Sequence, residues 1–400
     1  MISVEEARQL ITKSSVALMP VDRKITKSLH YVLARNVISP SHYPPFDQSA
    51  MDGYAIKHAD FIQKKKIKII GESPAGHPFK GRIISGQAVR IFTGAKVPNG
   101  TDTVVMQEHV TIEKEYLTID NPCLSIGSNI RKKSSIIKKG DVVLQKGNML
   151  NPGAIGLLAS LGVTMVKVFP KPDISIIVTG NELQASGKPL AEGKIYESNA
   201  IALNASLEAL NINVLKNFYS KDSEKGTIES INKAIEISDI VLITGGISVG
   251  KYDFVWSSMK RIGVENIFYK ITQKPGKPLF FGKYKKCLLF GLPGNPAAAL
   301  SCFYEYVYPA LQILQGHSAV FLEKINLPLA SDYEKKKGLS YFLKGKVSEG
   351  HVNILSGQES NNISSFAFAD CLIYLPENRK KIKKEENVEI HLLPYKNICY

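Results

Sequence analysis

The sequence predicts a multidomain protein in which a parallel α/β sheet domain is joined to β-rich modules and to a helical, extended N-terminal region. Changes in residue pattern along the 400 residues carry this prediction. From Asp173 to Leu314, apolar runs of strand length alternate with segments of helix length, which is typical of a parallel sheet covered by helices. Before and after that region, short alternating runs broken by Gly and Pro indicate β-rich structure.

Composition narrows the class of protein. The chain has 44% hydrophobic residues and is long enough for about two to four domains. A polar N-terminus and the lack of an apolar run of ~18 residues predict a cytoplasmic protein with no membrane partner. The five cysteines form no C-x-x-C pair, which argues against a zinc site or a disulfide framework. The net charge of +15 raises nucleic acid as a partner, but the lysine runs lack interleaved aromatics, so we expect a solvated surface and an anionic small substrate.

The N-terminal region is predicted to be helical and then extended. Ser3-x-x-Glu6 is a capping box ahead of an amphipathic helix that continues to about Ser15. A second short helix is expected around Leu29–Arg35, followed by an extended exit. In the next motif, FDQSAMDGYA, Asp52 and the glycine after it are a turn signal before a strand. The plain alternative for this motif is a hairpin turn.

Short alternating runs between Lys57 and Gly147 predict a β-rich module. Within it, RIFTGAKVPNGTDTVVMQE carries glycine-containing turns, and Thr93 presents a hydroxyl at a strand end. NIRKK, which begins at Asn129, adds three cations that suit a polyanion. Each of these features alone is more often ordinary surface than a binding site.

One stretch of the α/β region, DIVLITGGISVGKYD (239–253), combines a strand, a glycine turn and a helix start. Its first half is apolar and β-branched, which suits a central buried strand. Free N–H groups and the dipole of the helix that begins near Phe254 favour a bound anion. Asp253 beside a bound phosphate suggests that Mg²⁺ lies between them. The structural alternative is a tight turn, with Asp253 serving as a helix cap.

Polar and glycine-rich residues follow several predicted strands, at the edge where open α/β sheets bind ligands. These strand ends are Thr179–Glu182, Asp222, Gly245–Asp253, Lys270–Lys277 and Gly291–Pro296. Several such ends converging on one edge are harder to explain by packing than a single glycine turn.

Eight ordered motifs resemble those of the molybdopterin molybdenumtransferase (MoeA) family, which includes the C-terminal enzyme domain of gephyrin. They are FDQSAMDGYA, RIFTGAKVPNGTDTVVMQE, SNIRKK, VTGNEL, IYESN, TGGISVGKYD, KPGKP and GLPGNPAAAL. The resemblance continues to SFAFADCLIYLPE and covers essentially the whole chain. It implies a homodimer whose subunits have a helical and extended domain (1–45 and 148–172), a β-rich insertion (46–147), a molybdopterin adenylyltransferase-like α/β domain (173–320) and a C-terminal β-barrel (321–400).

The resemblance implies an enzyme of molybdenum cofactor biosynthesis that inserts molybdate into adenylated molybdopterin and releases AMP with the help of Mg²⁺. Asp253 and Glu182 are the candidate metal ligands. Molybdate is a tetrahedral dianion, for which Lys270, Lys274 and Lys277 are the candidate cations. The catalytic residues implied are Asp52, Thr93, Glu182, Asp222, Asp253, Lys270 and Lys274. The substrate-binding residues implied are Gly245, Gly246, Ser248, Lys277, Pro293, Gly294, Asn295 and Pro296.

Three positions depart from the family pattern. Ile136 stands where relatives often have an acid after the NIR motif, so no side chain supplies that carboxylate here. Asn181 replaces the common Asp of VTGNEL and removes a charge near the proposed metal. Glu197 in IYESN is one methylene longer than the usual Asp.

Two alternatives of different kinds stay open. A molybdopterin adenylyltransferase shares the α/β domain, but its usual turn is TGGTG and it needs no N-terminal β module. A non-catalytic molybdopterin-binding scaffold would bind partners without turnover, and AMP release distinguishes it from an enzyme. The resemblance also implies a cleft closed by the N-terminal half of the other subunit, and complexes with a molybdopterin adenylyltransferase and with cofactor-acceptor proteins.

Overall fold

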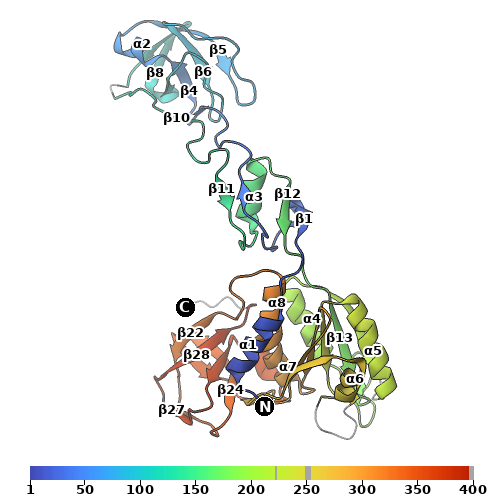
Figure 1. Cartoon of the computed structure of the whole chain (residues 1–400). Coiled ribbons are helices and arrows are strands. Elements are labelled where there is room, and N and C mark those ends of the chain that lie inside the picture. The colour runs from blue at the N-terminus through green and yellow to red at the C-terminus, as the bar shows by residue number, and fades with distance from the viewer. Residues whose placement is uncertain (122, 221–222, 248–253, 396–400) are drawn as a thin grey trace. The chain divides into compact units, whose positions relative to one another are not determined.

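The computed structural model describes residues 1–121, 123–220, 223–247 and 254–395 (Figure 1). The chain divides into two compact units. The larger unit contains Met1–Val21, His30–Ala34 and the described part of Lys167–Tyr400. The smaller unit contains Asp22–Leu29 and the described part of Arg35–Val166. Within these described ranges, no helix is long and apolar enough to cross a bilayer.

Helix α1 (Val4–Ser14) opens the larger unit and confirms the predicted capping box. The amide of Glu6 donates to Ser3 Oγ at 3.1 Å, and acidic residues in the first turn complement the helix dipole. The second helix predicted around Leu29–Arg35 is wrong. His30 adopts a positive φ of 64°, which a right-handed helix does not accommodate, and the nearest helical turn is a short 3₁₀ segment, Ile25–Lys27.

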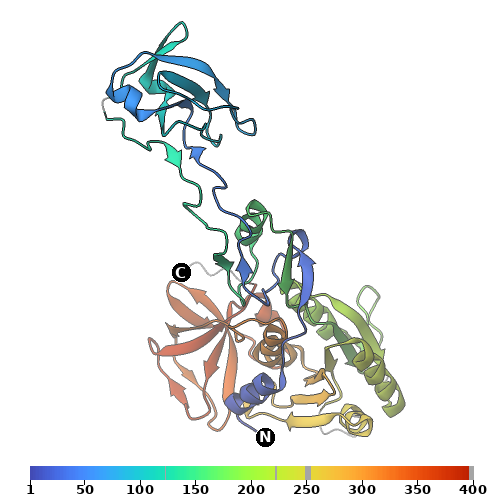
Figure 2. The same ribbon diagram turned by 45° about the horizontal axis from the view of Figure 1, so that its top comes forward.

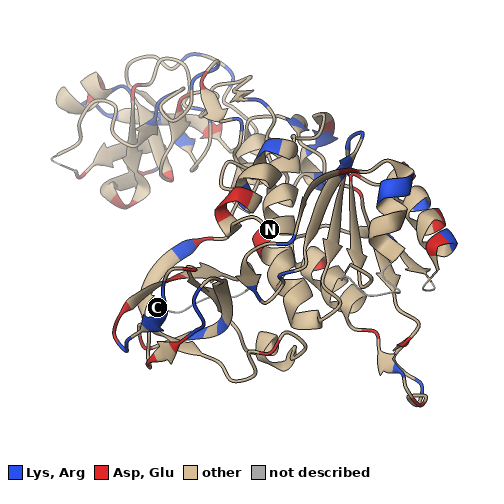
Figure 3. Cartoon of the chain, turned by 60° about the horizontal axis from the view of Figure 1, so that its bottom comes forward, with Lys and Arg blue, Asp and Glu red and all other residues tan. Residues whose placement is uncertain are grey.

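A six-stranded sheet lies at the centre of the larger unit, in the order β16-β13-β17-β21-β20-β18. Its strands are β13 (Ile174–Thr179), β16 (Val214–Ser220), β17 (Ile240–Thr244), β18 (Glu265–Tyr269), β20 (Phe280–Tyr284) and β21 (Cys287–Leu292). The first four in the order pair in parallel, as predicted. The three central parallel strands are buried along their whole length, and they carry mostly uncharged residues (Figure 3).

The prediction of a fully parallel sheet is wrong at one edge, where β20 is antiparallel to β21 and β18 is antiparallel to β20. The turn between β20 and β21 has two residues, Lys285 and Lys286, and so short a connection joins antiparallel strands. Two reversals give β18 the same direction as β21. The carboxyl end of β18 therefore lies at the same edge of the sheet as those of the parallel strands.

Helices cover both faces of this sheet (Figures 1 and 2). The helices are α4 (Asn199–Ala209), α5 (Glu224–Ile237), α6 (Phe254–Ile262) and α7 (Pro296–Cys302). Successive residues of β13 point to opposite faces, so Ile176 shares a core with Leu203 of α4, whereas Ile177 shares the other core with Ile231 of α5. α7 packs in the first core and α6 in the second.

The helix predicted over 296–314 is interrupted by a π-helical segment. α7 is followed by Phe303–Val307 in π-helical form and then by α8 (Tyr308–Leu314). Pro309 has no amide to donate to the carbonyl of Glu305, four residues earlier, which accounts for the local change in hydrogen bonding.

A buried ion network joins α1 and the π-helical segment to β28 (Asn387–Leu392). Glu305 contacts the guanidinium of Arg8 and, at 2.7 Å, Nδ1 of His391, and all three side chains are buried. Burial alone would raise the pKa of Glu305, but His391 and Arg8 lower it below its usual value. Burial alone would lower the pKa of His391, but the Glu305 carboxylate raises it.

The C-terminal region of the larger unit forms a second sheet, in the order β19-β24-β26-β28-β22, with β25 paired to β24. The strands not yet given are β19 (Gln273–Lys274), β22 (Lys324–Pro328), β24 (Ser340–Ser348), β25 (His351–Ile354) and β26 (Cys371–Leu375). β19 comes from the α/β region and pairs in parallel with β24, opposite Ser340 and Tyr341. Two short ribbons complete the unit: β14 (Leu183–Gln184) with β15 (Ile195–Tyr196), and β23 (Tyr333–Glu334) with β27 (Lys381–Ile382).

The smaller unit is centred on a sheet in the order β7-β4-β6-β5-β9-β8. Its strands are β4 (Gly53–Ile56), β5 (Ile67–Ser73), β6 (Gln87–Ile91), β7 (Thr103–Met106), β8 (Val110–Glu113) and β9 (Tyr116–Ile119). The β-rich prediction is confirmed for this region, although it missed helix α2 (His58–Ile62). Helix α3 (Pro152–Ser160), capped by Asn151 and followed by Gly162 at φ 79°, begins at the predicted residue. Short ribbons pair β1 (Val21–Lys24) with β12 (Met165–Val168), β2 (Val37–Ile38) with β11 (Val142–Leu144), and β3 (Gln48–Ser49) with β10 (Ile130–Arg131).

Replacing Glu305 with Gln is expected to lower the free energy of unfolding of the larger unit by about 3–5 kcal/mol, because Arg8 and His391 lose their buried counter-charge. Urea unfolding followed by the fluorescence of Trp256, the single tryptophan of the chain, measures this loss. Arg261→Gln is the control, because it removes an exposed ion pair with Glu224 outside the network and is expected to cost less than about 1 kcal/mol. A Glu305→Gln protein as stable as the parent would contradict the role given to the network.

Candidate active site

The carboxyl ends of β13, β17 and β21 open onto a hollow of about 480 Å³ in the larger unit. Ligands of open α/β sheets bind at this edge, and the volume falls in the range of small-molecule sites. The hollow is lined by Thr179, Gly180, Glu182, Leu183, Ile195, Asn199, Thr244, Gly245, Gly246, Ile247, Pro278, Pro293, Gly294 and Asn295.

In the turn after β17, two glycines expose backbone without side chains to the hollow. Gly245 and Gly246 have φ values of 82° and 62°. A Cβ on Gly245 would lie 2.5 Å from the carbonyl oxygen of Thr179, and one on Gly246 would lie 2.9 Å from Cγ2 of Val255. Both the backbone conformation and the close packing therefore require glycine at these two positions.

Side-chain hydrogen bonds at two neighbouring residues fix the loop after β21, LPGNP. Asn199 Nδ2 donates to the carbonyl of Gly294 at 2.8 Å, and Asn295 Nδ2 donates to Ser360 Oγ at 2.8 Å. A Cβ on Gly294 would meet the Cα of Gly245 at 3.6 Å, so the two glycine loops pack against each other. The loop thus presents Gly294 and Asn295 to the hollow from a fixed backbone.

Glu182 is the acidic side chain among the described residues that line the hollow, and it is exposed there. Its predicted companion, Asp253, lies outside the described residues, as do Ser248 and Asp222. The described part of the chain holds no group of three or more His, Cys, Asp or Glu that could hold a metal ion. Mg²⁺ is commonly bound by one or two carboxylates together with substrate phosphates, so an exposed Glu182 at a hollow that can hold a small molecule fits such an ion.

The longer acid at Glu197 has a structural role at the start of α4. Its carboxylate is buried, and Oε1 accepts a hydrogen bond from the amide of Ala200 at 2.7 Å. Ser198, at the N-cap position, makes no such bond with its side chain. Glu197 therefore caps the helix that positions Asn199 at the hollow.

The candidate lysines share one loop, which runs from Lys270 to Leu279. The amide of its first residue donates to the carbonyl of its last at 3.0 Å. Lys270 Nζ lies 4.8 Å from the centroid of the Tyr269 ring. None of the three lysines lines the hollow, although Pro278 of the same loop does. The three lysines therefore share a loop that reaches the hollow through Pro278, and none of their side chains lines it.

A buried cluster anchors this lysine loop to the π-helical segment. Gln273 is 1% exposed; its side-chain oxygen accepts from the hydroxyl of Tyr306, and its Nε2 donates to the carbonyl of Pro275 at 2.9 Å. Gly276 has a φ of 87°, and a Cβ there would lie 2.4 Å from Sγ of Cys302. The path of the loop between its lysines is therefore set by contacts inside the core.

Asp52 and Thr93 lie in the smaller unit and contact each other. Oδ1 of Asp52 accepts from the amide of Thr93 at 2.7 Å and from its hydroxyl at 2.8 Å. These bonds, the backbone one first, lower the pKa of Asp52 below its usual value. Two motifs separated by 41 residues thus form one charged, hydrogen-bonded pair.

The NIRKK cations of the smaller unit surround a carboxylate. Asp47 accepts from the amide of Lys133 at 2.8 Å and lies 3.1 Å from Nζ of Lys132. Ile136, which replaces the acid common in the family, is 64% exposed and makes a backbone hydrogen bond to Tyr43. The NIRKK motif therefore meets an acid of the FDQSAMDGYA motif, and Ile136 leaves an apolar side chain in solvent.

Comparison with known proteins follows the same division of the chain. Profiles of the MoeA N-terminal region (domain I and II), of a "Probable molybdopterin binding domain" and of the MoeA C-terminal region (domain IV) match residues 2–162, 175–313 and 326–393. A molybdopterin molybdenumtransferase of Haemophilus influenzae is 35% identical over 379 residues, covering 92% of this chain and 94% of that protein. This chain belongs to the MoeA family. One from Staphylococcus aureus (strain COL) is also 35% identical, over 404 residues that cover 98% of this chain and 95% of the relative.

The solved structures agree with the family assignment. A crystal structure of the molybdopterin biosynthesis MoeA protein from Pyrococcus horikoshii has a TM-score of 0.87 and 29% identity, and both chains are covered completely. The family assignment confirms the predicted family, the transferase class and the role in molybdenum cofactor biosynthesis. It does not test the roles of single residues, which stay predictions.

Several residues of this MoeA site escaped the sequence analysis. Asn199 and Pro278 line the hollow although neither was chosen as a site residue, and each is the last residue of a quoted motif, IYESN and KPGKP. Ser360 reaches Asn295 from the C-terminal region, where no motif marks it. Pro296 was predicted to bind substrate, but it is the first residue of α7 and is not among the lining residues.

Tyr306→Phe is expected to cost about 1–3 kcal/mol of unfolding free energy, because it leaves the buried oxygen of Gln273 without its donor. Adding Gln273→Leu should restore only part of that loss, since it also removes the donor to the carbonyl of Pro275. Urea unfolding of the single and double variants measures the coupling. Tyr308→Phe, at a half-buried neighbouring position, is the control. Equal stabilities of Tyr306→Phe and the control would count against the anchor.

Thr93→Val is expected to raise the pKa of Asp52 part of the way to its ordinary value, because the hydroxyl bond is lost while the backbone bond remains. Because the pKa of Asp52 is lower in the folded protein than in the unfolded chain, the ionised carboxylate stabilises the fold at pH values above the unfolded-state pKa. This stabilisation is lost as the pH falls through the folded-state pKa. Titration of the Asp52 carboxyl carbon by NMR measures the shift. Thr111→Val, which removes a hydroxyl that bonds to Asp120, should leave Asp52 unchanged. An unmoved Asp52 in Thr93→Val would contradict the pairing.

Proposed function

We propose that this MoeA chain inserts molybdate into adenylated molybdopterin and releases AMP, and that the hollow at the carboxyl edge of the central sheet is where this occurs. The observation that carries the proposal is the pair of interlocked glycine loops after β17 and β21. Gly245 and Gly294 present backbone without side chains, which allows the phosphates of a nucleotide to approach closely. Glu182 faces the same space.

The proposed metal is Mg²⁺, held by Glu182 and by Asp253, with substrate phosphates completing its shell. When bound, it would offset the charge that develops on the phosphoryl oxygens as the link to AMP breaks. Glu182 itself orients the phosphate end of the substrate, because the exposed carboxylate lies over Gly180 at the rim of the hollow.

Molybdate, the second substrate, is assigned to the lysine loop. A dianion needs several hydrogen-bond donors. The loop carries Lys270, Lys274 and Lys277 within eight residues, and the backbone hydrogen bond from Lys270 to Leu279 joins its two ends. Lys274 rests 5.4 Å from the centroid of the Tyr341 ring, an exposed cation–π contact that is weak enough to be exchanged for an anion. The lysine side chains are long and flexible, so their amines can reach a substrate held beside Pro278.

The Asp52–Thr93 pair is assigned to the same reaction through a homodimer. Because these residues lie in the unit that does not contain the hollow, we infer that the pair of one subunit serves the hollow of the other. We also propose that Asp222 is a catalytic residue. The four-domain layout with a C-terminal β-barrel, which the family resemblance implies, is part of the same proposal. The proposal also includes the cytoplasmic location and the complexes with a molybdopterin adenylyltransferase and with cofactor-acceptor proteins.

Single-turnover AMP release tests the proposal. Purified protein with adenylated molybdopterin and Mg²⁺ is expected to release AMP faster when molybdate is added, with one equivalent of metal-containing cofactor formed. Lys274→Ala and Asp253→Ala should each slow product formation by about 100-fold or more while leaving the unfolding transition unchanged. Lys346→Ala, an exposed lysine on the strand that also carries Tyr341, is the matched control. Normal turnover by either site variant would remove that residue from the mechanism.

The same assay separates the two alternatives. A molybdopterin adenylyltransferase would consume ATP and form adenylated molybdopterin, so AMP release would not depend on molybdate. A scaffold would bind adenylated molybdopterin and release no AMP even as a folded dimer. Either result would overturn the proposed reaction.

A further inference from the structure

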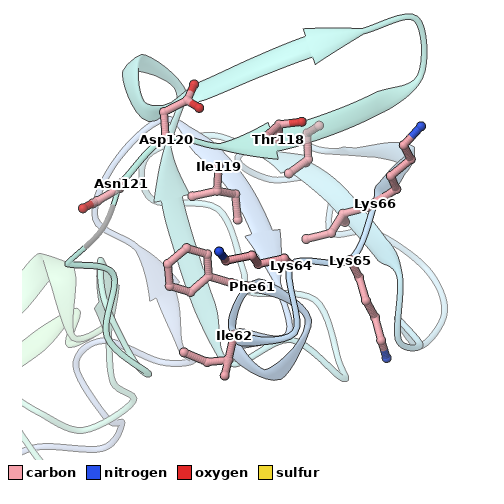
Figure 4. Close-up of a pocket in the computed structure, with 11 residues that line it drawn as sticks. Phe61, Ile62, Lys64, Lys65, Lys66, Thr118, Ile119, Asp120 and Asn121 are labelled. Atoms are coloured by element: carbon pink, nitrogen blue, oxygen red, sulfur yellow. The ribbon is translucent and has the colours of Figure 1, made fainter.

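A second pocket, of about 620 Å³, lies in the smaller unit, in a different unit from the hollow at the sheet edge (Figure 4). It is formed by the end of α2, by the lysine-rich turn that follows α2, and by strand β9 of the neighbouring hairpin. Its volume lies in the range of sites that hold small molecules. Neither the family motifs nor the proposed reaction uses these residues.

The floor of this pocket is apolar and continuous with the core of the smaller unit. Ile67 and Leu117 are buried at its base, and Phe61 and Ile119 are partly buried and pack against the same core cluster. Ile62, at the mouth, is 64% exposed. An apolar surface left open to water in this way is typical of a place where an apolar group binds.

The lysine-rich turn is held in a defined conformation at one side of the pocket. The amide of Lys64 donates to the carbonyl of Phe61 at 3.0 Å, and the amide of Lys65 donates to that of Asp60 at 3.1 Å. Asp60 is buried and also accepts from the hydroxyl of Ser85 at 2.5 Å and from the amide of Gly86 at 2.8 Å. The turn is therefore fixed to the sheet through Asp60.

The two lysines at the start of this turn differ in what they face. Lys65 Nζ lies 3.6 Å from Asp60, and its side chain points away from the floor. Figure 4 shows the Lys64 side chain lying across the pocket beside Phe61. Within the described ranges, the ion pair of this turn is made by Lys65 and not by Lys64. Lys64 thus places a cation over an apolar floor.

The opposite rim limits the charge that the pocket accepts. Asp120 lines the pocket, its carboxylate accepts from the hydroxyl of Thr111 at 2.7 Å, and in Figure 4 it points away from the floor. A carboxylate at this rim disfavours nucleotides and other polyanions. Lys66 also lines the pocket, but in Figure 4 its amine points away from the floor, so Lys64 is the lysine whose side chain lies over it. This arrangement suits a ligand with an apolar body and one negative charge at one end.

We propose that this pocket binds a small amphipathic monoanion, whose apolar body fills the floor at Phe61, Leu117 and Ile119 and whose carboxylate meets the amine of Lys64. The proposal is independent of the reaction proposed for the larger unit. A peptide added as a strand has little room, because β9 pairs with β8 along its whole length and with β5 at Tyr116 and Leu117, which leaves a free edge of two residues. The ligand is therefore a small molecule rather than an extended chain.

Decanoate is the probe, because it has an apolar chain and one carboxylate. In the full chain, with isoleucine methyl groups labelled for NMR, decanoate is expected to shift the signals of Ile62, Ile67 and Ile119 with a Kd of about 1 mM or tighter. The methyl signal of Ile243, in the core of the larger unit, should not move. Decylammonium, with the same chain and the opposite charge, should bind at least about fivefold more weakly.

Substitutions at exposed positions test the site without unfolding it. Lys64→Gln should weaken decanoate binding about three- to fivefold and Lys64→Glu more, because the charge partner is removed or reversed. Ile62→Ser should weaken it about fivefold through lost apolar contact. Lys80→Gln, an exposed lysine outside the pocket, is the matched control and should change nothing.

Three results would overturn the proposal. The first is a decanoate titration in which the signals of Ile67 and Ile119 do not move. The second is binding of decylammonium as tight as that of decanoate. The third is a Lys64→Gln protein that binds decanoate as tightly as the Lys80→Gln control.

Discussion

One buried carboxylate, that of Glu305, holds together parts of the larger unit that are far apart in the sequence. It contacts Arg8 of α1 and His391 of β28, and all three side chains are buried. Charges buried this deeply are tolerated when they are paired and hydrogen-bonded, so the three elements must assemble around one another. The next residue, Tyr306, bonds to Gln273, so the same π-helical segment also fixes the lysine loop.

Much of this architecture was predictable because it follows from local patterns. The apolar runs of β13, β17 and β21, the capping residues of α1 and α3, and the glycine turn after β17 each have a signature within a few residues. The antiparallel edge was not predictable in this way, because a strand's direction depends on its neighbours and not on its own residues. The helix expected at 29–35 failed because His30 adopts a positive φ, which His does more often than most residues but too seldom for its presence to mark a turn.

The same distinction between local patterns and long-range contacts applies to the candidate site. Gly245, Gly246, Gly294 and Glu182 were found at the hollow because strand ends converge in any open α/β sheet. Ser360 and Tyr306 were missed because they act through side-chain contacts that bridge 65 and 33 residues. Glu197 departed from the family pattern by one methylene, and its carboxylate caps α4, a role that its longer side chain can fill from one residue before the N-cap. Sequence motifs identified several of the loops that line the hollow, and packing decided which of their atoms face it.

The lysine loop is held by a sheet other than the central one, because its strand β19 pairs in parallel with β24 of the C-terminal sheet. Lys274 lies opposite Tyr341, so the backbone carrying it is hydrogen-bonded into the C-terminal sheet. Any displacement of that sheet would also displace the backbone of Lys274. Changes in the C-terminal sheet can therefore shift Lys274 even though no residue of that sheet is among the described residues that line the hollow.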